Sequence, residues 1–188
     1  MVGIIALAVL AVVLVYFIMI YNGLVVIKNN VDKAWANIDV LLKQRHDELP
    51  KLIDTCRQYM QYEQETLEKV IQARSRVADA RESQNITALG MAEGALRAGL
   101  GSLFALVESY PELKANENFL HLQSRITGLE NAIADRREFY NDSVNIKNVR
   151  IEQFPDLIVA RLFNFGSAEL LRFEAGELED VDISKRFG

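Results

Sequence analysis

The side chains best suited to catalysis are few in this 188-residue sequence, and they lie far apart. There are two histidines, His46 and His121, on different predicted helices. A di-metal site in a helical bundle needs carboxylates from facing helices and a repeated Glu-x-x-His motif, and neither histidine follows a glutamate at that spacing. Glu117 lies four residues before His121, where a surface ion pair is the usual explanation. We therefore predict no metal ligands and no cofactor.

The one cysteine, Cys56, does not belong to a recognisable catalytic set. A single cysteine excludes an intramolecular disulfide and any C-x-x-C metal or redox motif. Cys56 falls in an apolar helical stripe, where a cysteine is ordinarily a small core residue rather than a nucleophile. No Ser-His-Asp or Cys-His order stands out, so we predict no catalytic residues and no enzyme activity.

Charged residues do occur at positions where helical stripes need apolar side chains. A buried charge is costly alone, so such residues either pair across helices or face water or a partner, and a modest rotation of the helices would also expose them. We predict a structural polar layer that sets helix register, in which the arginines pair with Glu63 and Glu130. Arg136→Met and Glu130→Gln should then be coupled in a double-mutant cycle. The predicted layer consists of Arg45, Glu63, Glu108, Glu130, Arg136 and Arg137, with Glu93 and Lys147 at further in-phase positions.

The element that positions everything else is an apolar N-terminal stretch. Residues 1–27 contain no charged residue and no histidine, and Gly3 to Leu24 supply the roughly 20 residues that cross a hydrocarbon core of about 30 Å. Tyr16, Tyr21 and Lys28 are expected at the membrane interface. A cleaved signal is the alternative, but it would carry a basic n-region, and no Lys or Arg precedes the apolar run. We predict an uncleaved transmembrane anchor, with the lipid bilayer as a partner.

Charge indicates the orientation and excludes one class of partner. Lys28, Lys33, Lys43 and Arg45 follow the span, so the positive-inside rule predicts a single-pass protein whose domain is cytoplasmic. The formal net charge of −5 lies entirely outside the span, and a nucleic-acid-binding surface would instead be basic. We expect no nucleic-acid partner.

Beyond the span, apolar side chains alternate at spacings of three and four, the period of helices in bundles. From Val31 to Val77 this stripe predicts one long helix that continues the membrane helix, with Pro50 kinking or splitting it near Glu48. The polar stretch 79–87 predicts the first turn. The expected fold is all-α, with a single N-terminal transmembrane helix followed by an antiparallel long-helix bundle of the four-helix type.

Two further long helices complete the predicted bundle. One runs from Ile86 to Tyr110, and its glycines, each costing about 1 kcal/mol against alanine, should allow close approach of a neighbour. The other starts at Asn116 or Asn118 and ends at Phe154, before a proline. The glycines that we consider candidates for assembly are Gly90, Gly94 and Gly99.

The last part of the chain divides into an apolar segment and an acidic one. Residues 156–173 are apolar and aromatic, and we expect them to cap the open end of the bundle, with a membrane surface or a partner as alternatives. Phe163 and Phe165 in this segment are further candidates for assembly. Residues 174–188 are predicted to form an acidic, mobile tail. The predicted organisation is therefore an anchor (1–27), a helical bundle (28–173) and the tail.

Several stretches carry a resemblance to a known family. They are residues 21–25, the run AWANIDVLLKQRHDELPKLI (34–53), Ala73 and Arg74, the run ESYPELKANENFLHL (108–122), Glu130 and Asn131, the set Arg136, Arg137, Tyr140, Asn141, Val144 and Asn148, and finally Phe154 and Pro155. Together they resemble the LemA family of bacterial membrane-anchored proteins. The resemblance implies a four-helix bundle behind one span in the bacterial inner membrane, and no established enzymatic activity.

The function we expect is a non-catalytic, membrane-anchored scaffold or adaptor that self-associates as a homo-oligomer and organises or shapes membrane. The alternative is an accessory subunit of a membrane protease or transporter, which one-to-one binding to that protein would distinguish. A bundle enzyme or metal carrier is a weaker third possibility, which stoichiometric iron, manganese or zinc in the purified protein would revive.

Overall fold

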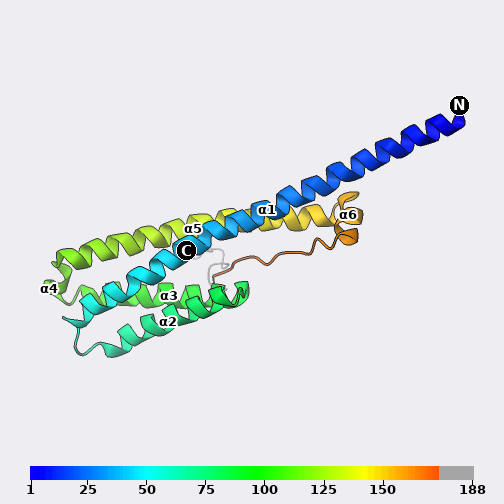
Figure 1. The fold of residues 1–188 in the computed structure, drawn as a ribbon. Coiled ribbons are helices and arrows are strands. Elements are labelled where there is room, and N and C mark those ends of the chain that lie inside the picture. The colour runs from blue at the N-terminus through cyan, green and yellow to red at the C-terminus, as the bar shows by residue number, and fades with distance from the viewer. Residues whose placement is uncertain (174–188) are drawn as a thin grey trace, which may run out of the picture. The chain divides into compact units, whose positions relative to one another are not determined.

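The computed structural model describes residues 1–173, and their regular secondary structure is entirely helical, which confirms the all-α prediction. The predicted acidic tail, residues 174–188, lies outside the described residues. By their contacts the described residues fall into two compact units, one of residues 1–38 and 136–170, the other of residues 39–135 and 171–173. The helices are α1 (Val2–Arg57), α2 (Gln64–Glu82), α3 (Ile86–Val107), α4 (Pro111–Lys114), α5 (Glu117–Glu152) and α6 (Asp156–Leu162), as Figure 1 shows.

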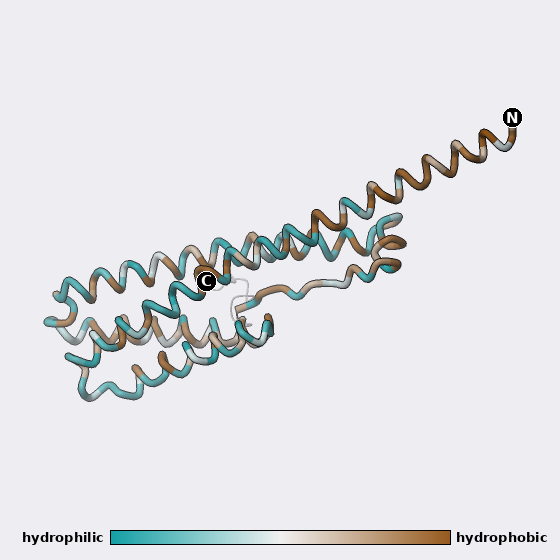
Figure 2. The backbone as a smooth tube through the Cα atoms, in the orientation of Figure 1, coloured by the Kyte–Doolittle hydropathy of each residue, from teal (hydrophilic) through white to brown (hydrophobic). Residues whose placement is uncertain are grey.

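In the first unit, α1 begins as a helix that is apolar on every side. Its side chains from Val2 to Met19 are exposed, except for Phe17, which is partly buried. Figure 2 shows this stretch as a nearly continuous brown tube. Within residues 1–173, α1 is the one helix that is long and apolar enough to cross a membrane. A helix that is apolar all round needs either a protein core or a bilayer around it.

The same unit has a small apolar core where α1, α5 and α6 meet. Ile20 and Leu24 of α1 pack with Ile151 of α5 and with Val159 and Ala160 of α6. Farther along, the rings of Trp35 and Tyr140 lie 5.8 Å apart between centroids. Because residue numbers rise along α1 as they fall along α5, these two helices are antiparallel.

In the second unit, parts of α1 and α5 pack with α2 and α3 as a bundle. Two contacts with each neighbour show that α1 is antiparallel to α2 and to α5. With α2 they are Asp39 to Arg81 and His46 to Arg74, and with α5 they are Arg45 to Glu130 and Glu48 to Arg125. Asn85 caps α3, its side chain accepting a hydrogen bond from the Ala88 amide at 2.9 Å, so the turn lies within the predicted polar stretch. The buried side chains include Leu42, Leu49, Leu52, Leu67, Val70, Leu89, Leu96, Leu103, Phe119, Ile126 and Ile133.

The prediction of one helix from Val31 to Val77 is wrong, because α1 ends at Arg57 and α2 begins at Gln64. Pro50 does not split α1, which stays helical on both sides of it. The turn between the helices contains no glycine or proline, so its sequence has no local signal of a break. Contacts with another turn hold it instead. Asn116 donates a hydrogen bond to the Tyr59 hydroxyl at 3.0 Å.

The start of α5 agrees with its sequence, whereas its end does not. The Asn116 side chain accepts a hydrogen bond from the Phe119 amide at 3.0 Å and so caps the helix, as one of the two predicted starts required. The helix ends at Glu152, two residues before the expected end at Phe154. Phe154 therefore leaves the helical stripe, and its side chain is exposed rather than buried.

Candidate functional site

The most unusual chemistry of the second unit is a buried cluster of charges, contributed by three helices. Arg45 of α1 donates hydrogen bonds to Glu93 of α3 and to Glu130 of α5. The side chains are 1, 0 and 14% exposed, respectively. Arg97 of α3 lies 3.5 Å from the second oxygen of Glu130, measured from its Nε. With all four groups ionised, the two cations balance the two carboxylates.

Burial and charge act against each other in this cluster. Burial alone would lower the pKa of Arg45, but Glu93 and Glu130 outweigh that effect and raise it, so Arg45 stays charged. Burial raises the pKa of Glu93 even though Arg45 opposes the shift. Arg45 Nε and Glu93 Oε2 are buried without a hydrogen-bond partner among residues 1–173. Such a cluster contributes little net stability, and its best-attested role is to select one helix alignment.

Only part of the predicted polar layer is in this cluster. Arg45 and Glu130 belong to it, and Glu93, which the stripe marked as in phase, completes it. Arg136 is exposed, because the buried face of α5 passes through the half-buried Arg137 instead. The arginine that pairs with Glu130 deep in the bundle is therefore Arg45, and the predicted pairing with Arg136 needs correction.

The remaining predicted layer residues are near the ends of the helices. Glu63 precedes α2 and accepts a hydrogen bond from the Tyr110 hydroxyl at 3.4 Å, so its partner is a phenol and not an arginine. Glu108 is exposed at the end of α3 and pairs with Lys114. Neither carboxylate is in the buried layer, because Glu63 precedes the first buried residue of α2, Leu67, and Glu108 follows the last buried residue of α3, Val107. The sequence stripe does not distinguish a helix interior from its end.

A second polar contact joins α1 to α2. Arg74 Nε donates to the His46 carbonyl oxygen at 3.0 Å, and the guanidinium lies 2.6 Å from His46 Nε2. Burial and the charge of Arg74 lower the pKa of His46, so its ring is held neutral with Nε2 as the acceptor. His121 lies on the surface of α5, away from any such contact within the described residues. In residues 1–173 no group of three His, Cys, Asp or Glu side chains is placed to hold a metal ion.

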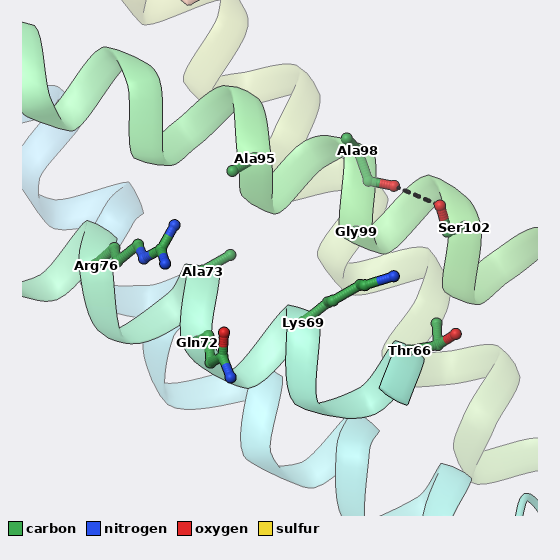
Figure 3. Close-up of a pocket in the computed structure, with 9 residues that line it drawn as sticks. All are labelled: Thr66, Lys69, Gln72, Ala73, Arg76, Ala95, Ala98, Gly99 and Ser102. Carbon is green, nitrogen blue, oxygen red and sulfur yellow. Dashed lines mark hydrogen bonds between the residues drawn. The ribbon is translucent and has the colours of Figure 1, made fainter. Parts of the chain in front are cut away.

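A groove of about 490 Å³ lies between α2 and α3. Figure 3 shows Ala73, Ala95 and Ala98 along it, with Lys69 and Arg76 at its sides. Its small side chains let the two helices approach, and a Cβ added at Gly99 would lie 3.4 Å from Val70 Cγ2. That distance is an ordinary van der Waals contact, so the packing of α2 on α3 does not by itself require glycine at position 99.

Gly90, by contrast, is required by a close approach inside the chain. A Cβ added there would lie 1.9 Å from the carbonyl oxygen of Arg172, so only glycine admits the extended segment 171–173 against α3. Phe173 in this segment is buried, with its ring centroid 5.7 Å from the guanidinium carbon of Arg97. Gly94 is half-buried. A role of these glycines in assembly stays a prediction, and the close approach of Arg172 already accounts for Gly90.

The predicted interface and aromatic residues belong to the first unit. Tyr16 and Lys28 are exposed on α1, as an interface position requires. Tyr21 is half-buried, with its ring centroid 4.7 Å from that of Phe163 and 5.9 Å from that of Phe165. The two phenylalanines, predicted as assembly candidates, thus already have partners on α1.

The sequence matches a known protein family. Residues 34–184 match the LemA family, which is well over half of the chain. The chain belongs to the LemA family. Protein LemA of Metamycoplasma hominis is 28% identical over 163 residues, which make up 86% of this chain and 72% of that protein. The resemblance inferred from the sequence is thus confirmed.

Two further relatives match over a shorter region. Magnetosome protein MamQ 2 of Paramagnetospirillum magneticum is 33% identical and Magnetosome protein MamQ of Magnetospirillum gryphiswaldense is 32% identical, each over 78 residues. That region is 42% of this chain but only 29% of either relative. The LemA family is not a known enzyme family, and its matched region includes the cluster of Arg45, Glu93 and Glu130.

Sequence reasoning missed two features of this LemA-family chain. Arg97 was not singled out, although it lies four residues after Glu93 and so shares its helix face. The Asn148 side chain both donates to the Ala168 carbonyl and accepts from the Ala168 amide, each at 2.9 Å. Asn148 had been noted only as part of the family resemblance, since a contact between residues 20 positions apart has no local signal.

Proposed function

We propose that this LemA-family protein is a non-catalytic scaffold or adaptor, anchored by α1 in the bacterial inner membrane, where it self-associates. In this proposal its helical domain faces the cytoplasm. The partial relatives are named as magnetosome proteins, and their names mention no reaction. In this proposal, homo-oligomers supply the repeated unit that a scaffold needs.

The observation that carries the proposal is the exposed apolar part of α1. From Val2 to Met19 its side chains lack protein cover in the described chain, apart from Phe17. Burying one Val, Leu or Ile side chain is worth about 1.5–3 kcal/mol, so leaving the whole stretch in water would be prohibitive. A bilayer removes that cost, because the stretch has the length of a hydrocarbon core.

Self-association follows most simply from the same helix. Transmembrane helices associate by van der Waals packing, and small residues let their backbones approach. The span contains Ala6, Ala8 and Ala11 among valines, leucines and isoleucines. A Cβ added at Gly3 would have no described atom within 4 Å, so this part of the helix is open to a second one.

The deciding experiment is the protein mass of the full chain after gentle detergent extraction, measured by light scattering with the detergent contribution subtracted. A discrete or very large homo-oligomer would support the scaffold. A monomer would refute self-association. Cross-linking in cells would then test the accessory-subunit alternative, for which one-to-one capture of a membrane protease or transporter is the expected result.

Orientation has its own test, because the chain offers a clean reporter position. Tyr62 is 91% exposed in the turn after α1, whereas the native Cys56 is buried. A Tyr62→Cys variant should react with a membrane-impermeant maleimide only after the inner membrane is opened. Labelling of intact spheroplasts would instead place the domain outside the cytoplasm, with the unsubstituted chain as the blank.

A further inference from the structure

Phe163 and Phe165, which follow α6 in sequence, pack directly on the predicted membrane span. Phe163, just after α6, has its ring centroid 6.0 Å from that of Phe17 and 4.7 Å from that of Tyr21. Val159 and Ala160 of α6 are buried in the core that Ile20 forms with its neighbours. All these residues belong to the first unit, and Figure 1 shows α6 beside α1.

These contacts set the depth of α6 relative to the span. Phe17 precedes Leu24, the predicted end of the span, by seven residues, which is about 10 Å along a helix. Tyr21 precedes the same end by three residues, or about 4–5 Å. A ring packed on both must therefore lie below the membrane boundary or at it. If α1 spans the bilayer, the end of α6 must therefore lie at about the depth of Phe17 and Tyr21.

The exposed surface of α6 and of the residues beside it carries large apolar side chains, as a position at the membrane boundary requires. Ile158 and Leu162 are four residues apart, so they share one side of α6, and they are 55 and 68% exposed. Phe154 before the helix and Phe163 after it are 81 and 48% exposed. In Figure 2, α6 contains brown, apolar residues as well as teal, hydrophilic ones. Exposed to water, such an apolar surface would favour aggregation, whereas a bilayer would bury it.

The apolar surface is also held in place. Asn148 makes the two hydrogen bonds to Ala168 described above, and the Tyr140 hydroxyl donates to the Glu169 carbonyl at 3.0 Å. Arg150 Nε donates to Asp156 Oδ1 at 2.6 Å, at the start of α6. Because both ends of the segment are tied to α5, little ordering is required when it meets another surface.

We propose that residues 154–163, here called the α6 shoulder, enter the boundary between lipid headgroups and acyl chains beside the span, so that the protein contacts the bilayer at two places. This inference rests on the proposed anchoring of α1. The occupant of the apolar face is lipid, because the face continues the surface of the span itself through Phe17 and Phe163. Apolar faces of interfacial helices are buried to about 5–10 Å, which agrees with the depth derived from α1. Arg161, exposed on α6, directs its charge to the headgroups.

The test places a thiol-linked fluorophore at one position at a time in the full chain. The chain is reconstituted in vesicles of phosphatidylcholine and phosphatidylglycerol whose acyl chains are brominated near the headgroup or near the bilayer centre. Val9, 58% exposed, reports on the span, and Leu162 reports on the α6 shoulder. Cys56 stays in place, because burial raises its pKa to about 12 and the unsubstituted chain gives the labelling blank.

Phe139 is the matched water control. Its side chain is 53% exposed, and its neighbour Tyr140 contacts Trp35, which lies eleven residues, or about 16 Å, beyond Leu24. We expect Leu162→Cys to lose emission to shallow bromine, Val9→Cys to lose it to deep bromine, and Phe139→Cys to lose it only to aqueous iodide. Should Leu162→Cys fail to keep its helical circular dichroism, Ile158→Cys on the same face replaces it.

Each other outcome has a distinct meaning. If Leu162 behaves like Phe139 while Val9 is quenched by lipid, the α6 shoulder is overturned and the anchor remains. If Val9 is not quenched by either lipid, the anchor of the proposed function fails. If Leu162 is protected from bromine and iodide alike, protein covers the face, and a second copy or another partner replaces lipid as its occupant.

Discussion

Removal of Arg45 should destabilise the bundle far more than removal of any surface charge. Arg45→Met keeps a long, unbranched side chain but removes the positive charge between two carboxylates. Glu130 keeps Arg97 at 3.5 Å, whereas Glu93, 0% exposed, loses the only hydrogen-bond donor that it has among the described residues. Breaking a buried pair in this way costs about 3–5 kcal/mol, because an uncompensated charge remains.

The cost should fall when the stranded carboxylate is also removed. Glu93→Gln alone leaves Arg45 paired with Glu130 and still offers an acceptor, so it should cost about 1 kcal/mol. The double variant Arg45→Met with Glu93→Gln contains no stranded charge. It should therefore be more stable than the two single effects predict, with a coupling of about 1–3 kcal/mol.

Thermal and urea unfolding of the full chain in detergent, followed by circular dichroism, measure these differences. For a chain of this size a loss of 3–5 kcal/mol corresponds to a fall of roughly 6–20 °C in Tm. The matched control is Arg125→Met, which removes an exposed arginine paired with Glu48 at 3.0 Å, also between α1 and α5, and should cost at most about 1 kcal/mol. Additive effects of Arg45→Met and Glu93→Gln, or a loss equal to that of the control, would refute the reasoning.

Three further predictions concern single residues of the second unit. Gly90→Ala should lower Tm, because its Cβ would meet the Arg172 carbonyl. Gly101→Ala has no described atom within 4 Å of the added Cβ, so it should raise the free energy of unfolding by about 0.5–1 kcal/mol. Equal effects of the two substitutions would contradict the close approach at Gly90. In the folded state the pKa of His46 is lowered below 6.5, so the unfolded chain takes up the proton first and the free energy of unfolding should fall as the pH drops below 6.5. His46→Gln should flatten this pH dependence in urea titrations. An unchanged pH dependence would exclude His46 as its source. The buried Cys56, with its pKa raised to about 12, should react with a thiol reagent at neutral pH only as fast as the bundle opens, and rapid labelling of the native protein would contradict its burial.

The sequence correctly predicted most of what depends on local pattern. An uncharged apolar run of this length is recognisable without tertiary information, since its length and composition alone match a bilayer. The spacing of three and four identified buried positions in α1, α3 and α5, because a helix presents every third or fourth side chain on one face. Asn116 was one of two predicted starts of α5, and its cap is likewise a local contact.

The same pattern failed where a break or a partner lies far away in the chain. The stripe continued across residues 58–63, since no glycine or proline marked the turn, and the hydrogen bond from Asn116 to Tyr59 that helps hold it is nonlocal. On α5, the choice between Arg136 and Arg137 depended on a rotation of the helix by one residue, which only packing against its neighbours decides.

The sequence by itself thus determined the kinds of elements and their inward faces, because helical period and hydrophobicity act between near neighbours. Only the tertiary structure decided that Arg45 pairs with Glu93 and Glu130, which are 48 and 85 residues away. It also decided that Phe163 packs on Phe17 of α1. Such pairs depend on how helices align along their axes and rotate about them, and many alignments satisfy the same apolar stripe.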